Sequence, residues 1–228
     1  MEEVTIIIPV KNEEVGLTYL LEEYNKSDLK ENYDVKFILI IDSRTDDYSK
    51  KVASGFPGEI IDQYKSTGKG AAIMQAVHSW KREPNPKVIF LDADGSYSFE
   101  QISNILEKLD HFDIVSGSRF LNRKGRLEGM SRLHHIGNKI LSATSSFRNR
   151  QKITDLCTGL WGFRENALLD IEFKSKGFDL EAEIFGLIRK NRYSHAEIGV
   201  EWSQRKGGIS KLRSITDGLI ILRRIILT

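Results

Sequence analysis

The chain has 228 residues, of which 40% are hydrophobic and 29% charged, and its formal net charge at pH 7 is +2. This composition excludes a disordered chain and is sufficient for one large globular domain. The single cysteine, Cys157, excludes an internal disulfide and is compatible with a reducing compartment. We expect no signal peptide and no membrane span, because the start is acidic and no apolar run reaches about 18 residues.

The first half of the sequence alternates between strand-like and helix-like segments. We predict a strand over residues 4–9 that ends at Pro9, because proline cannot donate to a strand ladder, and a helix with Asn12 as its N-cap. Further strands are predicted at residues 35–41, 59–63, 88–91 and 114–118, with helices near 73–80 and 102–109. This alternation predicts parallel pairing with right-handed crossovers. A dinucleotide dehydrogenase is disfavoured because the G-x-G-x-x-G motif is missing.

Two carboxylates follow the predicted strand at residues 88–91, in the sequence Asp92-Ala93-Asp94-Gly95. Open α/β sheets bind ligands just beyond the carboxyl ends of their strands. Mg²⁺ and Mn²⁺ prefer oxygen ligands and commonly share one or two carboxylates with substrate phosphates. The pattern predicts a diphosphate and metal site with Asp92 and Asp94 as the metal ligands; the alternative is an ordinary turn.

The second half of the sequence is basic. Residues 119–152 contain nine Lys or Arg against one acid, and residues 201–228 contain six against two. We predict a helix over 130–147, a strand over 160–164, a helix over 178–190 and a strand over 196–202. The charge indicates an anionic partner such as a phosphate or an acidic lipid, and no recognisable module supports nucleic acid.

The apolar tail from residue 214 to 228 is interrupted by Arg223 and Arg224. It fits an interfacial helix at a bilayer surface, the start of a transmembrane segment, or a helix packed on the core. We expect membrane association.

Nine short motifs occur in order along nearly the whole chain and together resemble one family. They are Ile8-Pro9-Val10-Lys11-Asn12-Glu13-Glu14, the acidic turn at Asp42, Gly68-Lys69-Gly70-Ala71-Ala72, Asp92-Ala93-Asp94, Gly117-Ser118-Arg119, Arg132 with Ile136-Gly137-Asn138, Asp155-x-x-Thr158-Gly159, Glu181-x-Glu183, and Arg205-x-Gly207-Gly208-x-Ser210-Lys211-Leu212. The set resembles the inverting family 2 glycosyltransferases of the GT-A fold, and among them the polyprenyl-phosphate sugar synthases of the dolichyl-phosphate mannose synthase type. Gly95-Ser96-Tyr97 departs from the Leu-Gln-His common in mannose synthases, so the sugar nucleotide stays open between GDP-mannose, UDP-glucose and UDP-GlcNAc types.

The resemblance implies one α/β domain with a Rossmann-like, mostly parallel sheet flanked by helices. The implied domain covers residues 1–212, with a nucleotide-binding half (1–118) and an acceptor-binding half (119–212), and an amphipathic helix follows at 213–228. It implies transfer of a hexose from a nucleotide-diphosphate sugar to a polyprenyl or dolichyl phosphate, with Mg²⁺ or Mn²⁺, by a cytoplasmic protein peripheral at the inner face of a membrane.

The resemblance also implies roles for individual residues. Ligand-binding roles fall on Pro9, Val10, Asn12, Glu13, Asp42, Lys69, Asp92, Asp94 and Arg132, and catalytic roles on Asp92, Asp94, Arg119, Asp155, Arg205 and Lys211. A lipid phosphate monoester has a second pKa of about 6, so such an acceptor needs cations to hold it but no strong base.

Two other functions stay open on sequence grounds. A related transferase acting on a sugar hydroxyl would need a carboxylate base, for which Asp155 is the candidate. A non-catalytic module that binds sugar nucleotides or anionic lipids would have no need for Asp92 and Asp94. Individual residues also have plain structural alternatives: Arg119 and Arg132 as surface charges, Asp155 as a turn cap, and Glu181 and Glu183 as exposed helix acids.

Overall fold

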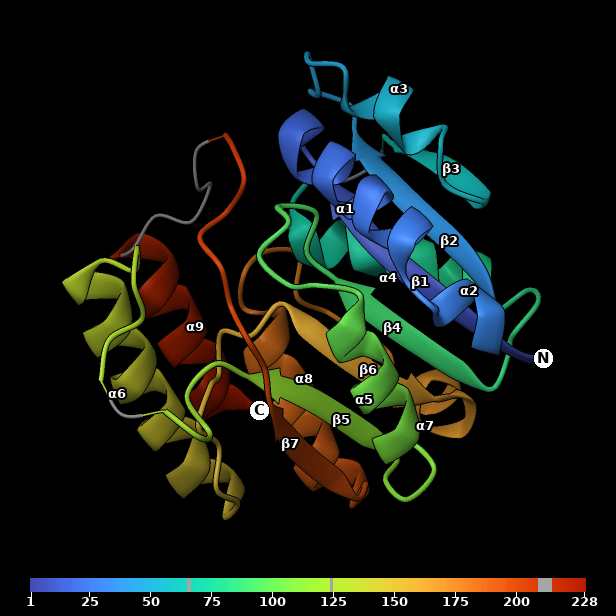
Figure 1. The fold of residues 1–228 in the computed structure, drawn as a ribbon. Helices are drawn as coiled ribbons and strands as arrows, with labels where there is room; N and C mark the ends of the chain where they lie inside the picture. Colours follow the sequence, from blue (N-terminus) through green and yellow to red (C-terminus); the bar gives the residue numbers. More distant parts are fainter. Residues whose placement is uncertain (65–66, 124, 209–214) are drawn as a thin grey trace.

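In the computed structural model the described residues are 1–64, 67–123, 125–208 and 215–228. Within them seven strands form one sheet in the order β3-β2-β1-β4-β6-β5-β7 (Figure 1). The strands are β1 (Glu2–Val10), β2 (Tyr33–Asp42), β3 (Gly58–Gln63), β4 (Lys87–Leu91), β5 (Ile114–Ser118), β6 (Leu160–Arg164) and β7 (His195–Gly199). Neighbouring strands are parallel except at β6, which runs antiparallel to both β4 and β5. The predicted mostly parallel α/β sheet is confirmed.

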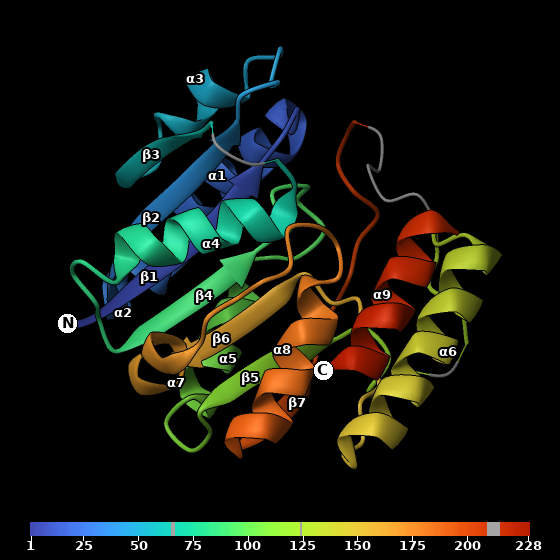
Figure 2. The same ribbon diagram turned by 180° about the vertical axis from the view of Figure 1, so that it is seen from behind.

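Helices cover both faces of this sheet (Figures 1 and 2). They are α1 (Glu14–Lys26), α2 (Leu29–Asn32), α3 (Ser49–Ala53), α4 (Lys69–Trp80), α5 (Glu100–Lys108), α6 (Arg132–Asn149), α7 (Glu165–Asp170), α8 (Leu180–Asn191) and α9 (Thr216–Leu227). Successive residues of a strand point to opposite faces. Ile6 and Ile8 therefore join the core under α1 and α5, while Ile7 joins the core under α4 and α8. Burial on both faces explains why β1 and β4 read as continuous apolar runs.

Two expectations at the end of β1 are wrong. The strand continues through Pro9 to Val10, because beyond Ile7 it pairs only with β2 and a residue without an N–H is tolerated on the side that has no ladder. The N-cap of α1 is Glu13 rather than Asn12, and Asn12 has a φ of 49°. The Asn12 side chain instead donates to Asp46 Oδ1 at 2.6 Å, which ties the first loop to the loop after β2.

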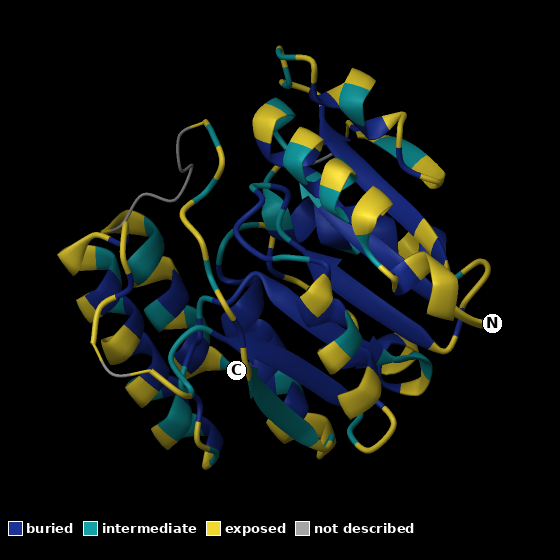
Figure 3. Cartoon of the chain, in the orientation of Figure 1, coloured by how far each residue is buried: buried dark blue, intermediate teal, exposed yellow. Residues whose placement is uncertain are grey.

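Helices α6 and α9 pack side by side next to the sheet (Figure 1). The N-cap of α6 is Ser131, whose side chain accepts the backbone N–H of His134. The predicted C-terminal helix is present as α9, and its buried residues Ile221 and Ile225 join the core. Both helices carry residues that are exposed as well as buried ones (Figure 3). Within the described ranges, none of the helices is long and apolar enough to cross a membrane.

Candidate active site

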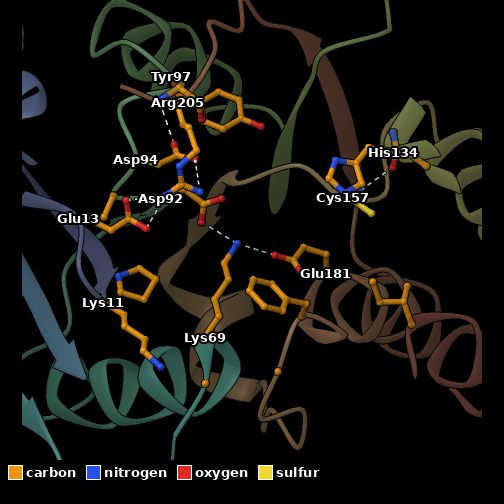
Figure 4. A pocket seen from close by; sticks show the side chains of 18 of the residues that line it. Lys11, Glu13, Lys69, Asp92, Asp94, Tyr97, His134, Cys157, Glu181 and Arg205 are labelled. Carbon is orange, nitrogen blue, oxygen red and sulfur yellow. Dashed lines mark hydrogen bonds and ion pairs between the residues drawn. The ribbon is translucent and has the colours of Figure 1, made fainter. Parts of the chain in front are cut away.

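A pocket of about 700 Å³ opens at the edge of the sheet where β1, β2 and β4 end (Figure 4). Its lining comes from these strand ends, from the start of α4, from α6, α8 and α9, and from the segment after β7. Parallel strands place their carboxyl ends at the same edge, so residues far apart in sequence meet there. The pocket therefore lies where the acids at the strand ends predicted a ligand.

Asp92 and Asp94 follow β4 and both line the pocket. Asp94 Oδ1 accepts the backbone N–H of Ser96 at 3.0 Å, which fixes the turn. Gly16 of α1 packs against the same turn, and a Cβ at that position would lie 2.3 Å from the carbonyl oxygen of Ala93. The Asp94 carboxylate and the turn that carries both acids are therefore held by backbone contacts.

The Lys69 ammonium bridges two carboxylates inside the pocket. Its Nζ lies 2.7 Å from Asp92 Oδ1 and 2.7 Å from Glu181 Oε1 (Figure 4). Burial lowers the pKa of Lys69, but the two carboxylates outweigh burial and hold that pKa above its usual value. Burial raises the pKa of Glu181 in spite of the nearby ammonium. The three side chains form a cluster of one cation and two acids.

Glycines flank Lys69 because another part of the chain passes close to it. Gly68 has a φ of 108°, and a Cβ at Gly70 would lie 2.2 Å from the carbonyl oxygen of Ser175. The glycines in this motif let the segment before α8 approach the start of α4, which brings Glu181 within reach of Lys69.

Arg205 is held beside the Asp92–Asp94 turn by acidic side chains. Its Nη2 donates to both carboxylate oxygens of Glu13, at 2.6 and 2.7 Å, and its Nη1 lies 3.9 Å from Asp94 Oδ2. The backbone N–H of Lys206 donates to the carbonyl oxygen of Asp94 at 2.9 Å. The segment after β7 is therefore fastened to the first loop and to the acidic turn together.

Arg119 lines the pocket, and Asp155 lies behind it. Asp155 is completely buried and accepts from Arg119 Nε at 2.6 Å and from Arg119 Nη2 at 2.7 Å. Burial lowers the pKa of Arg119, but the Asp155 charge more than compensates and raises that pKa well above its usual value. Asp155 is absent from the lining formed by the described residues. Asp155 therefore orients Arg119. Because Asp155 is buried and already paired, the structure does not support Asp155 as a base for an acceptor hydroxyl.

Asp42 lies at the end of β2, where it lines the pocket with Pro9 and Val10. The Arg44 side chain donates to Asp42 through Nε at 2.9 Å and Nη2 at 2.8 Å. The hydrogen bonds from Arg44 hold the pKa of Asp42 below its usual value, against the effect of burial. A carboxylate at this depth can accept N–H groups of a nucleotide base.

Two predicted ligand-binding residues are absent from the pocket lining that the described residues form. Asn12 contacts Asp46 and is absent from the pocket lining, and Arg132 is exposed at the first position of α6, also away from the lining. Lys211 lies outside the described residues.

The structure adds pocket residues that sequence reasoning did not assign to a ligand, among them Arg44, Gln63, Tyr97 and Glu181. Glu181 belongs to a motif that the sequence showed, but acids in a first helical turn are usually exposed and only the fold reveals the burial of this one. Glu183 is buried as well and accepts the backbone N–H groups of Lys174 and Ser175. The alternative of exposed helix acids is therefore wrong.

The pocket has an apolar branch between α6 and α9. Its lining here includes Met130, Leu133, Leu141, Phe178 and Ile221. Gly137 and Gly218 also line it, and a Cβ built on either glycine would meet no atom within 4 Å. One cavity thus joins a charged end at the strand termini to an apolar end between two helices.

The carboxylates fit a divalent cation that is shared with a substrate. Nowhere in the described ranges do three His, Cys, Asp or Glu side chains gather closely enough to hold a metal ion by themselves. Mg²⁺ usually takes one or two carboxylates and completes its shell with water and substrate phosphates. Asp92 and Asp94 supply that number of acids at the pocket wall.

The sequence model of glycosyl transferase family 2 matches residues 5–171, a range that includes Lys69, Asp92 and Asp94. The chain belongs to glycosyl transferase family 2. Two relatives come from Haloferax volcanii. Glycosyltransferase AglJ is 27% identical over 220 residues, covering 96% of this chain and 69% of that protein. The dolichyl-phosphate hexose transferase is 27% identical over 226 residues, covering 99% of this chain and 93% of that protein.

This family 2 chain also resembles solved structures. Glucosyl-3-phosphoglycerate synthase from Mycobacterium tuberculosis, in complex with Mn²⁺, UDP-glucose and glycerol 3-phosphate, aligns with a TM-score of 0.67 and 15% sequence identity. The alignment covers 99% of this chain and 78% of that one. At this identity the likeness shows the fold alone, and the fold is GT-A.

Proposed function

We propose that this family 2 member transfers a hexose from a nucleoside-diphosphate sugar to a polyprenyl phosphate, with inversion at the anomeric carbon. The observation that carries the proposal is one continuous pocket with acids and cations at one end and an apolar branch between α6 and α9 at the other. An acceptor with an anionic head and an apolar tail matches that polarity. The name of the relative from Haloferax volcanii, dolichyl-phosphate hexose transferase, supports the same class of acceptor.

The donor fits the end of the pocket formed by β1, β2 and β4. Asp42 and its neighbours lie where the nucleoside would bind, and Lys69 lies beside the acidic turn where the diphosphate would bind. A divalent cation held at Asp92 and Asp94 would act as a Lewis acid toward the departing diphosphate. The base and the sugar are decided by the assay below.

The acceptor phosphate fits beside Arg119, whose orientation is fixed by its buried ion pair with Asp155. At neutral pH the phosphate monoester is largely a dianion, because its second pKa is about 6. Its oxygen can attack the anomeric carbon directly: the new carbon–oxygen bond forms as the bond to the nucleoside diphosphate breaks. No proton has to be removed, which agrees with a site where Asp155 is already paired.

The test is transfer of radiolabelled sugar from UDP- and GDP-sugars into a chloroform-extractable product, with dolichyl or undecaprenyl phosphate as acceptor and added Mn²⁺ or Mg²⁺. We expect label from one donor, and Asp94→Ala to lower the rate by about 100-fold or more. If the nucleotide is released but no lipid acceptor takes up label, the acceptor proposal is wrong. If there is neither turnover nor nucleotide binding, a non-catalytic module is favoured.

We also propose that α6 and α9 rest on a membrane surface, where a polyprenyl phosphate resides. Apolar side chains are more than half exposed on both helices, at Leu133, Ile136 and Ile140 of α6 and at Leu219 and Ile220 of α9. Exposed cations accompany them, at Arg132, Lys139 and Arg223. Apolar residues flanked by cations are typical of a surface that binds anionic lipid.

Co-sedimentation with vesicles that contain anionic lipid tests this placement. We expect the wild type to bind and Ile136→Glu with Ile220→Glu to bind at least tenfold more weakly. A pair of changes on the other side of the sheet, Glu22→Gln with Glu23→Gln on α1, is the control. Equal binding by the α6–α9 variant and the wild type would contradict the placement.

A further inference from the structure

Lys69, Asp92 and Glu181 come from three separate elements and meet at one point of the pocket. Lys69 is the first residue of α4, Asp92 follows β4, and Glu181 is in the first turn of α8. Their exposed side-chain fractions are 16%, 32% and 8%. The acid that is farthest from solvent, Glu181, therefore holds the ammonium from the protein side, while Asp92 holds it from the side that faces the pocket.

The geometry of the ammonium leaves one of its hydrogens for a ligand. A lysine ammonium has three N–H donors. Two of them point to Asp92 and Glu181 at 2.7 Å each, and the third has no partner among the described residues. Since Lys69 lines the pocket, this third N–H can reach a bound oxygen without breaking either ion pair.

The Asp92 carboxylate is itself fixed on its other side. A Cβ at Gly159 would lie 2.0 Å from Asp92 Oδ2, so this oxygen rests against the glycine, and the backbone N–H of Asp92 donates to the Gly159 carbonyl at 3.1 Å. Asp92 consequently has little freedom to reposition Lys69. Glu181 is the second anchor of the ammonium.

We propose that Glu181 is a positioning residue for sugar transfer: it anchors Lys69 so that the third N–H of the ammonium meets the diphosphate of the donor. The proposal rests on the proposed function, because it requires a diphosphate leaving group. Negative charge grows on that group as the bond to the sugar breaks, so a prepositioned cation stabilises the transition state more than the ground state. Glu181 acts only through Lys69 and does not touch the reacting atoms.

The test uses four variants: Glu181→Gln, Glu181→Asp, Lys69→Met and the double variant Lys69→Met with Glu181→Gln. We expect kcat to fall by about 100-fold in Lys69→Met and about tenfold in Glu181→Gln. We expect the double variant to be no slower than Lys69→Met alone, because Glu181 has nothing left to position. Glu181→Asp keeps the charge but shortens the side chain, so kcat should fall although the charge of the site is unchanged.

A binding measurement separates position from charge. The Mn²⁺ affinity of the complex with UDP or GDP is measured by electron paramagnetic resonance. Removing a nearby acid in Glu181→Gln should weaken Mn²⁺ binding, and removing the cation in Lys69→Met should strengthen it, each by about tenfold or less. The double variant should bind Mn²⁺ like the wild type and still transfer sugar slowly, and Glu181→Asp should also bind Mn²⁺ like the wild type.

Glu183→Gln is the matched control, because Glu183 is a buried acid in the same turn of α8 that bonds the 174–175 backbone and does not line the pocket. Thermal unfolding followed by circular dichroism reports the folded fraction of every variant. Wild-type kcat in Glu181→Gln or in Glu181→Asp would overturn the inference, as would an equal loss from Glu181→Gln in the presence and absence of Lys69. No turnover by the wild type with every donor would overturn the proposed function, and this inference with it.

Discussion

Arg119 and Asp155 form a two-pronged ion pair, with Arg119 Nε 2.6 Å from Asp155 Oδ2 and Arg119 Nη2 2.7 Å from Asp155 Oδ1. The Asn138 side chain donates to the same carboxylate at 2.9 Å. A second-half loop and α6 are thereby joined to the end of β5. The guanidinium reaches the pocket in one orientation, which is what recognition of a phosphate requires.

The first prediction is that Asp155→Asn lowers the free energy of unfolding by about 3–5 kcal/mol, because removing one partner of a buried pair leaves Arg119 uncompensated. Urea denaturation of purified protein measures the change. The double variant Asp155→Asn with Arg119→Met should regain much of the stability, since it removes the uncompensated charge, but should stay inactive. Unchanged stability in Asp155→Asn would contradict the role given to the pair.

The second prediction concerns Gly159, whose missing side chain makes room for Asp92. Gly159→Ala would place a Cβ 2.0 Å from Asp92 Oδ2, and the end of this side chain must move. We expect kcat to fall at least tenfold, in the range found when one catalytic group is displaced.

The control for Gly159→Ala is the same change in an Asp92→Ala background. There the added methyl group has no carboxylate to displace, so it should cost little further activity. An equal loss of activity in both backgrounds would mean that Gly159 acts on something other than Asp92.

The fold could be predicted well from the sequence. Strands that are buried on both faces appear as apolar runs, and acidic residues follow several of these runs directly. Local details at the end of β1 could not be predicted from the sequence. Pro9 stays in the strand because one neighbouring strand has already ended, and no local pattern shows where a neighbour ends. Asn12 is a good N-cap residue by type, but its bond with Asp46 depends on a loop 34 residues away.

Only part of the site could be predicted, because local motifs are visible in the sequence and contacts between distant segments are not. Asp92, Asp94 and Lys69 were expected from local motifs, and the structure brings them together. The pairing of Lys69 with Glu181, 112 residues away, needs the segment before α8 to approach the start of α4. Arg132 was expected among the ligand-binding residues because its motif resembles that of the family, but it is exposed at the start of α6 and absent from the described lining.

The third prediction concerns the pH dependence of stability. His195 is packed against Trp161 and Phe185 and bonds Ser116 Oγ at 3.0 Å. Burial lowers the pKa of His195 to about 4 from 6.5. The unfolded chain therefore binds a proton below about pH 6.5 that the folded chain does not bind until about pH 4. The contribution of neutral His195 to the free energy of unfolding is fully present above pH 6.5. Up to about 3 kcal/mol of that free energy is lost as the pH falls to 4.

Urea denaturation between pH 7.5 and pH 4 measures this loss. In His195→Gln the stability should change less over the same range, because the titrating group is gone. His111→Gln is the control, since His111 is exposed, and its curve should match that of the wild type. A His195→Gln curve as steep as the wild-type curve would assign the acid sensitivity to other groups.

The fourth prediction concerns the apolar branch. Gly218 of α9 lines it and has open space where a side chain would be. Gly218→Leu should fill the branch without harming the helix, because leucine is favoured over glycine in helices by about 0.8 kcal/mol. If the acceptor chain lies there, KM for a long polyprenyl phosphate should rise at least tenfold, which corresponds to about 1.4 kcal/mol of lost binding.

A short acceptor distinguishes a blocked tail from a damaged site. A ten-carbon isoprenyl phosphate has a much shorter chain. If that chain stops short of Gly218, Gly218→Leu should change KM for this acceptor by less than about threefold, as expected for a neutral substitution. Ala143→Leu places a leucine at an exposed position of α6 outside the pocket lining and should leave KM for both acceptors unchanged. Equal rises in KM for short and long acceptors would place the bulk at the phosphate, and no rise for either would show that the lipid chain leaves the pocket by another path.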